Sequence, residues 1–522
     1  MKIRMFLRMI LIVIAVSLTA CAGMPRDVKK APSYVLEIKG DTRISKYLAL
    51  EQARHPGYSS YYLIPSDMDA FIARAHIIDL TDRTLDLQYF EVDDGMTTDI
   101  IMEKLIAAAD RGVRVRLLFD DYGTTLSDAQ LWLLDSHENI EVRLFNPLKE
   151  RTKGFTRSME AFGNFSKFNH RMHNKAFIAD NAIGIVGGRN LADAYFGARE
   201  DSNFQDMDLM AAGPIVPDIS KEFDTYWNSR WAIPLEFLTS ERPDGVQLKK
   251  NLEALKEQNK KAKDTKYAIR VKESDFFHMP KEHIRPNESW AKGVVLYDLP
   301  EKVSDEKVKD PYVYLLAQLL PLLKDIKSEM ILVAPYFVPG ESGMKLFKKE
   351  MAGGMKIKVL TNSLASTDEP AVYAGYEKYR KPLIEMGVEL YELRAMPTKD
   401  YEKERKKNIG TSGGELHAKF YVFDRKAAFV GSRNLDNRSN RINTEVGIFV
   451  ESPEIAGQLG IIFDVTTTPK NCFKLSMTKD SKLVWTGVEN GKEVKYYEEP
   501  DTTLNQRSAA GFYSVFAPES EL

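Results

Sequence analysis

One spaced pattern of polar residues occurs once in each half of the chain. Each copy has a His, a Lys, an Asp, a Gly and an Asn in the same order and at the same intervals: His173, Lys175, Asp180, Gly187 and Asn190, then His417, Lys419, Asp424, Gly431 and Asn434. A repeated unit that keeps one set of polar residues indicates a duplicated fold. The duplication therefore predicts two homologous lobes that contribute matching residues to a single site.

The segments that precede each copy also follow one layout. We expect helices over 70–78, 98–111, 315–326 and 343–351, and strands over 84–90, 113–119, 330–338 and 356–360. The order strand, helix, strand favours right-handed crossovers and a largely parallel sheet. The predicted fold is therefore α/β, with a first lobe over residues 60–230 and a second over 310–465.

The remaining segments connect or flank the two lobes. Residues 21–59 form an N-terminal segment, 231–309 an inter-lobe insert and linker, and 466–522 a C-terminal hairpin and tail around Asn490-Gly491. The insert contains a Lys-rich stretch over 244–266 with leucines on one helical face. A surface helix packed on the body is the favoured interpretation, and a basic face toward anionic lipid is the alternative.

The N-terminus has the features of an export signal. Lys2, Arg4 and Arg8 precede an apolar run over 9–16, which is too short for a transmembrane span. The run leads to Leu18-Thr19-Ala20-Cys21, which resembles a bacterial lipobox, so we expect residues 1–20 to be a signal peptide and Cys21 to be lipidated. A plain secretory signal or an uncut short anchor is the alternative. Lipidation predicts a cell-envelope protein facing the periplasm, with the outer membrane favoured by Ala22.

Composition excludes few classes but bears on partners. The 522 residues are 43% hydrophobic with a formal net charge of −2, so the basic excess typical of nucleic-acid-binding proteins is absent. Nucleic acid is not an expected partner, whereas a membrane surface is. With Cys21 acylated, Cys472 has no partner in the chain and is expected to be buried and inert.

The motif residues suit a phosphodiester. If 171–179 is a strand, His173 and Lys175 share one face, and the same holds for His417 and Lys419. Asp180 and Asp424 fall at hairpin turns; as motif members they are candidate catalytic residues, although a structural role is favoured. The hairpins lead to Gly187-Gly188 and Gly431-Ser432 and to predicted helix starts, where Asn190 and Asn434 would bind an anion.

Two imidazoles allow a two-step displacement. One His attacks phosphorus to form a phosphohistidine, while the other protonates the leaving alkoxide and then deprotonates the incoming hydroxyl. One His must then be neutral and the other charged, and a carboxylate partner would stabilise the charged state. Asp206 and Glu445, which follow the two motifs, are the candidates for orienting the histidines. This chemistry requires no metal and no cofactor.

The two copies resemble the HKD motifs of the phospholipase D superfamily. Residues 168–196, 335–340, 361–380 and 431–446 are similar to bacterial cardiolipin synthases, particularly the C type. The resemblance implies two pseudo-symmetric αβαβα lobes with the active site at their interface. It implies His173 as nucleophile and His417 as acid, with the reversed assignment as the alternative because the pair is pseudo-symmetric. It also implies phosphate binding by Lys175, Lys419, Asn190, Asn434 and Ser432. Gly188 departs from the Ser found in many first motifs.

The function predicted from these residues is phosphatidyl transfer between phospholipids. Phosphatidylglycerol would be the donor, with a second phosphatidylglycerol or phosphatidylethanolamine as the acceptor. A hydrolytic phospholipase D that releases phosphatidic acid uses the same residues and is the close alternative. An HKD nuclease is less consistent with the net charge and the predicted anchor, and an inactive scaffold is less consistent with two intact motifs.

Overall fold

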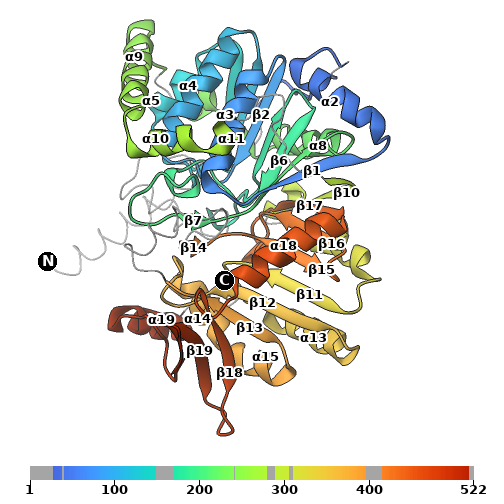
Figure 1. Cartoon of the computed structure of the whole chain (residues 1–522). Helices are drawn as coiled ribbons and strands as arrows, with labels where there is room; N and C mark the ends of the chain where they lie inside the picture. Colours follow the sequence, from blue (N-terminus) through green and yellow to red (C-terminus); the bar gives the residue numbers. More distant parts are fainter. Residues whose placement is uncertain are drawn as a thin grey trace, which may run out of the picture.

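The computed structural model describes residues 28–37, 40–148, 168–239, 242–278, 289–304, 310–395 and 414–516. The predicted signal peptide, Cys21 and the last residues of the tail lie outside these ranges. Two mixed α/β lobes lie one above the other, the first coloured blue to green and the second yellow to red (Figure 1). The edge strands β1 (Ser59–Ile64) and β10 (Ser289–Tyr297) pair antiparallel and join the two sheets.

The sheet of the first lobe contains eight strands. Their order in space is β1, β8 (Asp208–Ala212), β6 (Ile183–Gly187), β5 (Ala176–Ala179), β2 (Thr84–Tyr89), β3 (Arg114–Asp120), β4 (Ile140–Phe145) and β9 (Ala232–Pro234). Strands β2, β3 and β4 run parallel, and every other pairing is antiparallel. The expected largely parallel sheet is thus confined to three strands, because the motif itself forms the antiparallel hairpin β5–β6.

The sheet of the second lobe repeats this order. It runs β10, β17 (Val446–Glu451), β16 (Ala427–Gly431), β15 (Phe420–Phe423), β11 (Glu329–Val333), β12 (Lys356–Asn362), β13 (Glu389–Leu393) and β18 (Cys472–Met477). As in the first lobe, three successive strands, β11, β12 and β13, run parallel, and the other pairings named here are antiparallel. The C-terminal hairpin β19 (Leu483–Glu489) and β20 (Lys492–Tyr496) continues this sheet beyond β18. The matching orders establish the pseudo-symmetry of the lobes.

Helices cover the outer and inner faces of the sheets. The longer ones are α2 (Arg43–Arg54), α3 (Asp67–Leu80), α4 (Met96–Asp110), α8 (Val216–Trp227), α9 (Gly245–Ala262), α13 (Gly340–Ala352), α18 (Pro453–Thr466) and α19 (Leu504–Phe516), and the shorter ones include α5 (Asp128–Asp135), α10 (Lys266–Glu273), α14 (Pro370–Glu377) and α15 (Arg380–Met386). Local signals define their starts: Ser66 accepts a bond from the Asp69 N–H, and Ser127 and Gln130 form a capping box.

The hydrophobic core has three parts. One lies within each lobe, and the third lies between the two sheets, where Tyr61, Trp227, Phe420, Ile448 and Phe463 pack in one cluster. Burial of apolar surface at this shared core stabilises the association of the lobes by roughly 25 cal/mol per Å². The two halves are therefore fixed in one arrangement, as a site built from both requires.

Some expected elements are shorter or placed differently. The strand expected over 330–338 ends at Val333, because Pro335 cannot donate to a strand ladder. The helix expected over 315–326 is the short α12 (Leu315–Leu319) followed by a 3₁₀ turn that contains Pro321. Within the range assigned to the insert, β10 belongs to the second sheet and α9 packs on α4 and α5 as a surface helix. No helix in the described ranges is both long and apolar enough to span a bilayer.

Candidate active site

Backbone bridges between the lobes place the two histidines. His173 and Lys175 lie in an extended segment just before β5, and not within the strand expected over 171–179, because this backbone pairs with the other lobe. The His173 N–H donates to the Thr444 carbonyl at 2.9 Å. In the symmetric arrangement the His417 N–H donates to the Gln205 carbonyl at 2.7 Å. Each histidine thus follows a bridge to the opposite lobe.

The orienting carboxylates are exchanged between the lobes. Glu445 of the second lobe lies with Oε2 2.9 Å from Nδ1 of His173 in the first. Asp206 of the first lobe lies with Oδ2 2.6 Å from Nδ1 of His417 in the second. Both acids are buried, and the histidines are only 7% and 6% exposed. Because Nδ1 of each ring faces an acid, Nε2 is the nitrogen available for chemistry.

Both motif lysines are buried beside the histidines. Lys175 Nζ donates to the His173 carbonyl at 2.8 Å, and Lys419 Nζ donates to the His417 carbonyl at 2.5 Å and lies 2.8 Å from His417 Nδ1. Burial lowers the pKa of Lys175 to about 7, and that of Lys419 to about 8, although Glu445 and Asp206 partly offset this effect. An anionic substrate between two such lysines is electrostatically favoured.

Burial also controls the charge of the histidines. It lowers the pKa of His173 to about 4, with Lys175 adding to the decrease and Glu445 opposing it. Burial, followed by Lys419 and Lys175, holds the pKa of His417 well below its usual range. Neutral imidazoles with Nδ1–H directed at a carboxylate leave an unprotonated Nε2, which is the form a nucleophile requires.

The motif asparagines do not start long helices. Asn190 is followed by a single 3₁₀ turn (Asp193–Tyr195), and Asn434 by the five-residue α17 (Asn437–Arg441). Asn190 Nδ2 donates to Glu91 Oε2 at 3.0 Å and to the Tyr195 hydroxyl at 2.8 Å. The buried Oδ1 of Asn434 has no hydrogen-bond partner within the described part of the chain. The long helices whose N-termini were expected to bind an anion at Asn190 and Asn434 are therefore not found at these positions.

Glu91 and Tyr195 are site residues that the sequence analysis did not single out. The Tyr195 hydroxyl donates to Glu91 Oε2 at 2.9 Å and lies 3.5 Å from Nε2 of His417. Burial raises the pKa of Glu91 to about 7, with Asp93 adding to the increase and Tyr195 and Lys175 opposing it. One feature of the sequence could have indicated Glu91. It lies two residues after β2, and the loops that follow parallel strands gather at one edge of a sheet, where ligands bind.

Ser432 holds an acid in this structure. Its hydroxyl donates to Glu445 Oε2 at 2.5 Å, and Ser439 donates to Oε1 of the same carboxylate at 2.7 Å. At Gly188, the equivalent position of the first lobe, an added Cβ would lie 2.2 Å from Oδ1 of Asp206. The departure from Ser at Gly188 therefore has a steric cause. The carboxylate of Asp206, a side chain shorter than Glu445, occupies the space that a serine side chain at this position would need.

The motif aspartates lie at the opposite end of the hairpins from the histidines. The Asp180 carboxylate accepts bonds from the backbone N–H groups of Asp82, Arg83 and Thr84. The Asp424 carboxylate likewise accepts from the N–H groups of residues 327–329 and from the Ser328 hydroxyl. Both aspartates have left-handed backbone angles at the turn. In these contacts the two carboxylates anchor the starts of β2 and β11, which is the structural role favoured for them over a catalytic one.

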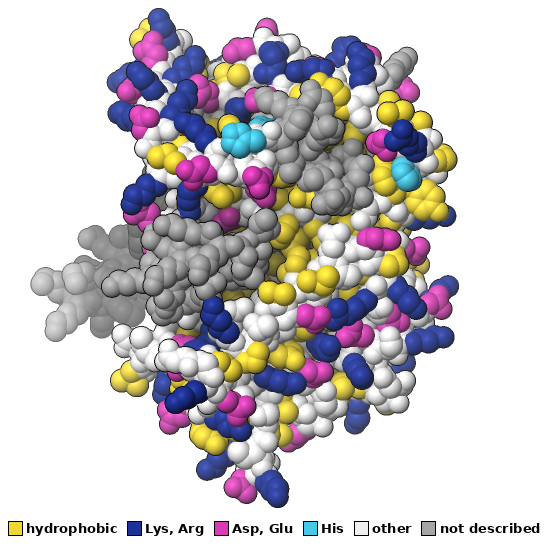
Figure 2. Space-filling view, viewed as in Figure 1, with side chains coloured by type: hydrophobic (Ala, Val, Ile, Leu, Met, Phe, Trp, Pro, Cys, Tyr) yellow, Lys and Arg dark blue, Asp and Glu magenta, His cyan; other side chains and the backbone are white. Residues whose placement is uncertain are grey.

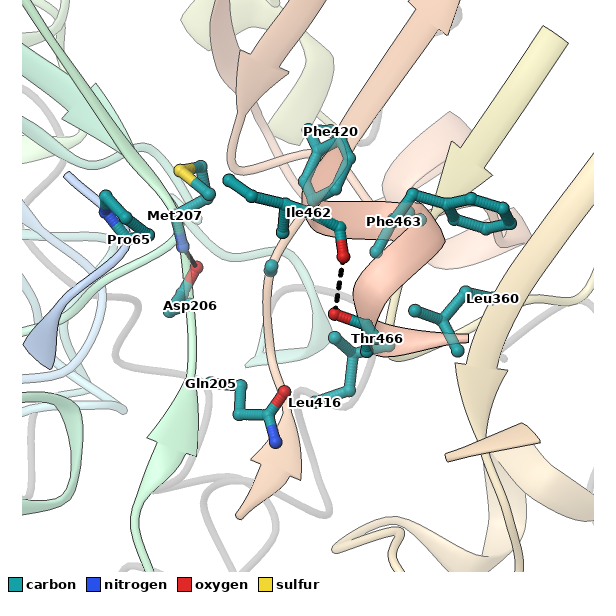
Figure 3. A pocket seen from close by; sticks show the side chains of 12 residues that line it. Pro65, Gln205, Asp206, Met207, Leu360, Leu416, Phe420, Ile462, Phe463 and Thr466 are labelled. Carbon is teal, nitrogen blue, oxygen red and sulfur yellow. Dashed lines mark hydrogen bonds between the residues drawn. The ribbon is translucent and has the colours of Figure 1, made fainter. Parts of the chain in front are cut away.

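An apolar crevice lies between the lobes beside Asp206. Gln205, Asp206 and Met207 line one side, and side chains of Leu416, Phe420 and α18 line the other (Figure 3). None of the motif His, Lys or Asn residues lines it. Asp206, which also contacts His417, therefore connects the crevice with the centre where the two His–acid pairs meet.

Two further findings concern ligands and thiols. Within the described ranges, no cluster of three or more His, Cys, Asp or Glu side chains has the arrangement needed to hold a metal ion. Cys472 is fully buried, as expected, and its Sγ lies 3.1 Å from the Thr466 carbonyl. Burial raises the pKa of this thiol well above its usual range, so its reactive thiolate form is disfavoured.

Comparison with known proteins places this arrangement. A family model described as cardiolipin synthase, PLD-like domain, matches residues 75–231 and 319–466. Cardiolipin synthase C of Escherichia coli K12 is 36% identical over 468 residues, covering 90% of this chain and 97% of that protein. The crystal structure of a phosphatidylserine synthase from Haemophilus influenzae has a TM-score of 0.55 at 12% identity, covering 90% of this chain and 97% of that one.

The two-lobed fold and the paired His and Lys residues define an enzyme of the phospholipase D superfamily. Within that superfamily, the chain belongs to the family of PLD-like cardiolipin synthases, as the family model and the identity to the Escherichia coli protein show. The resemblance inferred from the two motifs is thereby confirmed.

Proposed function

We propose that this chain is a phosphatidyl transferase that forms cardiolipin through a phosphohistidine. The observation that carries the proposal is the pair of crossed His–acid contacts, His173 with Glu445 and His417 with Asp206, beside two buried lysines. Family membership supports a phospholipid substrate. The roles differ from those expected from the sequence, because only phosphatidylglycerol carries the headgroup hydroxyl that cardiolipin formation needs. Phosphatidylglycerol is therefore the acceptor, and a second phosphatidylglycerol or a phosphatidylethanolamine donates the phosphatidyl group.

The first step breaks the headgroup ester. His173 Nε2 attacks phosphorus, a P–N bond forms, and the bond from phosphorus to the headgroup oxygen breaks. His417 Nε2 gives its proton to that oxygen, which leaves as an alcohol. Lys175 and Lys419 bind the non-bridging oxygens. The negative charge of the bound diester favours the protonated state of His417, which the empty site disfavours.

The second step transfers the phosphatidyl group. His417, now neutral, takes the proton of the acceptor hydroxyl, whose oxygen forms the new bond to phosphorus as the P–N bond breaks. Glu445 stabilises the positive charge that develops on His173 during the first step and fixes the ring for both. Water entering at this stage gives phosphatidic acid, the product of the hydrolytic alternative.

A lipid assay tests this function. The purified full chain in detergent micelles is incubated with phosphatidylglycerol, with and without phosphatidylethanolamine, and products are separated by mass. We expect cardiolipin, with glycerol or ethanolamine released according to the donor. Phosphatidic acid alone would make the chain a hydrolase. His173→Ala and His417→Ala, each folded, should lose turnover by about 10³-fold or more; activity in both would exclude the mechanism.

We further propose that Cys21 is lipidated and holds the enzyme at the membrane, in the periplasm-facing cell envelope. The lipobox-like residues before Cys21 support this proposal. Exposed hydrophobic side chains also support it: Ile461 and Val465 on α18 are 61% and 45% exposed, and Figure 2 shows hydrophobic side chains gathered across the middle of this face. Metabolic labelling with a radioactive fatty acid should mark the wild-type chain and spare Cys21→Ser. Labelling of both chains, or of neither, would contradict lipidation at this residue.

A further inference from the structure

The two halves of the active site differ at one pair of equivalent positions. In the first lobe Val92 forms a backbone bridge with Leu191, and in the second lobe Phe337 forms the equivalent bridge with Leu435. Glu91 therefore corresponds to Tyr336, and each directly precedes its bridge. Tyr195 and Ser439 each lie four residues after the bridged leucine of their lobe, so these two residues also correspond.

These replacements give the halves different contacts. Glu91 and Tyr195 bond to each other and to Asn190, and the Tyr195 hydroxyl reaches toward His417. Tyr336 instead donates to Asp368, and Ser439 donates to Glu445. Among the described residues, the first lobe thus supplies a hydroxyl network beside the reactive nitrogen of a histidine, and the second lobe has no counterpart.

We propose that Glu91, Asn190 and Tyr195 form the alcohol subsite, which positions the headgroup hydroxyl that leaves and the acceptor hydroxyl that enters at His417. The proposal rests on the phosphatidyl transfer described above. Tyr195 Oη and His417 Nε2 are 3.5 Å apart, so one hydroxyl oxygen can lie at about 2.8 Å from both. The asymmetry also assigns the acid–base role to His417, which leaves His173 as the nucleophile.

The charge of Glu91 sets the direction of the Tyr195 proton. A neutral Glu91 donates to the tyrosine oxygen, so the tyrosine proton can point at the substrate oxygen. That contact orients the acceptor while its own proton goes to His417 Nε2, its oxygen bonds to phosphorus, and the P–N bond to His173 breaks. An ionised Glu91 instead accepts the tyrosine proton, and the contact is lost.

Several charged groups face this network. Asp93, on the same loop as Glu91, favours its neutral form, whereas Lys175 favours its ionised form. The negative charge of Asp206, which lies in the segment after Tyr195, raises the pKa of the tyrosine hydroxyl further, in addition to the larger effect of burial. On the second lobe, Lys419 adjoins His417. The subsite should therefore be most effective below neutral pH and weaken as Glu91 ionises.

The test is exchange of deuterium-labelled glycerol into phosphatidylglycerol in micelles, with phosphatidic acid measured in the same samples. We expect Tyr195→Phe to raise the KM for glycerol about 5- to 10-fold and to increase the share of phosphatidic acid. Glu91→Gln, whose amide is a donor at every pH, should make the KM for glycerol independent of pH around pH 7, whereas the KM for phosphatidylglycerol, which depends on Lys175 and Lys419, should still rise. The matched variant Tyr336→Phe should leave the KM for glycerol unchanged.

A lower kcat in Tyr195→Phe with unchanged glycerol KM and product ratio would overturn the proposal, as would an equal effect of Tyr336→Phe. If the wild type gives only phosphatidic acid, the proposed transfer function is wrong. The subsite is then tested by its effect on the protonation of the leaving group. Tyr195→Phe should then slow cleavage of phosphatidylglycerol but not of phosphatidyl-p-nitrophenol, whose leaving group needs no proton. Equal slowing of both would reject the subsite.

Discussion

Glu445 contacts His173 across the lobe interface, with 2.9 Å between its Oε2 and the histidine Nδ1, although the two residues are separated by 272 positions in the chain. The Thr444 carbonyl accepts the His173 N–H, so the residue before the acid pairs with the histidine backbone. Asp206 and His417 repeat this relationship in the opposite direction through Gln205. Neither half of the chain therefore contains a complete His–acid pair.

Removing either crossed carboxylate should impair catalysis without unfolding the protein. Glu445→Gln leaves His173 free to adopt the wrong tautomer, and we expect kcat to fall about 10²- to 10⁴-fold. Asp206→Asn should do the same through His417. Single-turnover kinetics check this: Glu445→Gln should slow formation of the phosphohistidine. An unchanged rate in both variants would show that the carboxylates do not orient the rings.

Affinity for the phospholipid should weaken as pH rises from 7 to 9. The lysine pKa values are about 7 and about 8, so the charged forms that bind phosphate are lost through this range. A KM for phosphatidylglycerol that stays flat across it would contradict this reading. Lys175→Met should raise that KM at pH 6 by about 10-fold or more, with one ionisation removed from the profile.

Gly188→Ser should reduce activity although it restores a residue common in this motif. Its Cβ would lie 2.2 Å from Oδ1 and 2.8 Å from Cγ of Asp206, so the carboxylate must move away from His417. Misplacing a catalytic group by about 1 Å lowers kcat by roughly 10²-fold. Ser432→Ala is the matched change in the other lobe. It removes one hydrogen bond to Glu445 and should cost about 10-fold or less; equal losses would argue against the steric explanation.

Asp424→Ala should affect stability more than chemistry. The carboxylate anchors three backbone N–H groups and the Ser328 hydroxyl, and we expect a loss of about 1–3 kcal/mol in the free energy of unfolding. Burial alone would raise the pKa of Asp424, but these bonds lower it to about 2. The group therefore stabilises the fold above its unfolded pKa, and the contribution is lost as pH falls from about 4 to about 2. Denaturant unfolding at pH 7 and pH 3 checks this: the difference between wild type and variant should shrink at pH 3, and kcat per folded molecule should change little.

Local patterning in the sequence determined most of the elements and the identities of the central residues. The helix over 98–111 and the hairpin at Asn490-Gly491 were readable because apolar spacing and turn residues act over short distances. His173, Lys175 and their counterparts were readable because duplication preserved their spacing. Asp206 and Glu445 were identified as candidates, but each follows its own motif and nothing local indicates that they serve opposite histidines.

Only the tertiary structure decided which groups meet. The exchange of acids results from inter-lobe backbone bridges at Thr444 and Gln205, which are long-range pairings with no local signal. The same pairings keep His173 out of β5, and the proximity of Asp206 explains Gly188. Glu91 was unremarkable in sequence because its chemistry depends on burial beside Tyr195 and His417. Side-chain identity is encoded residue by residue, whereas charge state and pairing depend on neighbours brought together by the packed lobes.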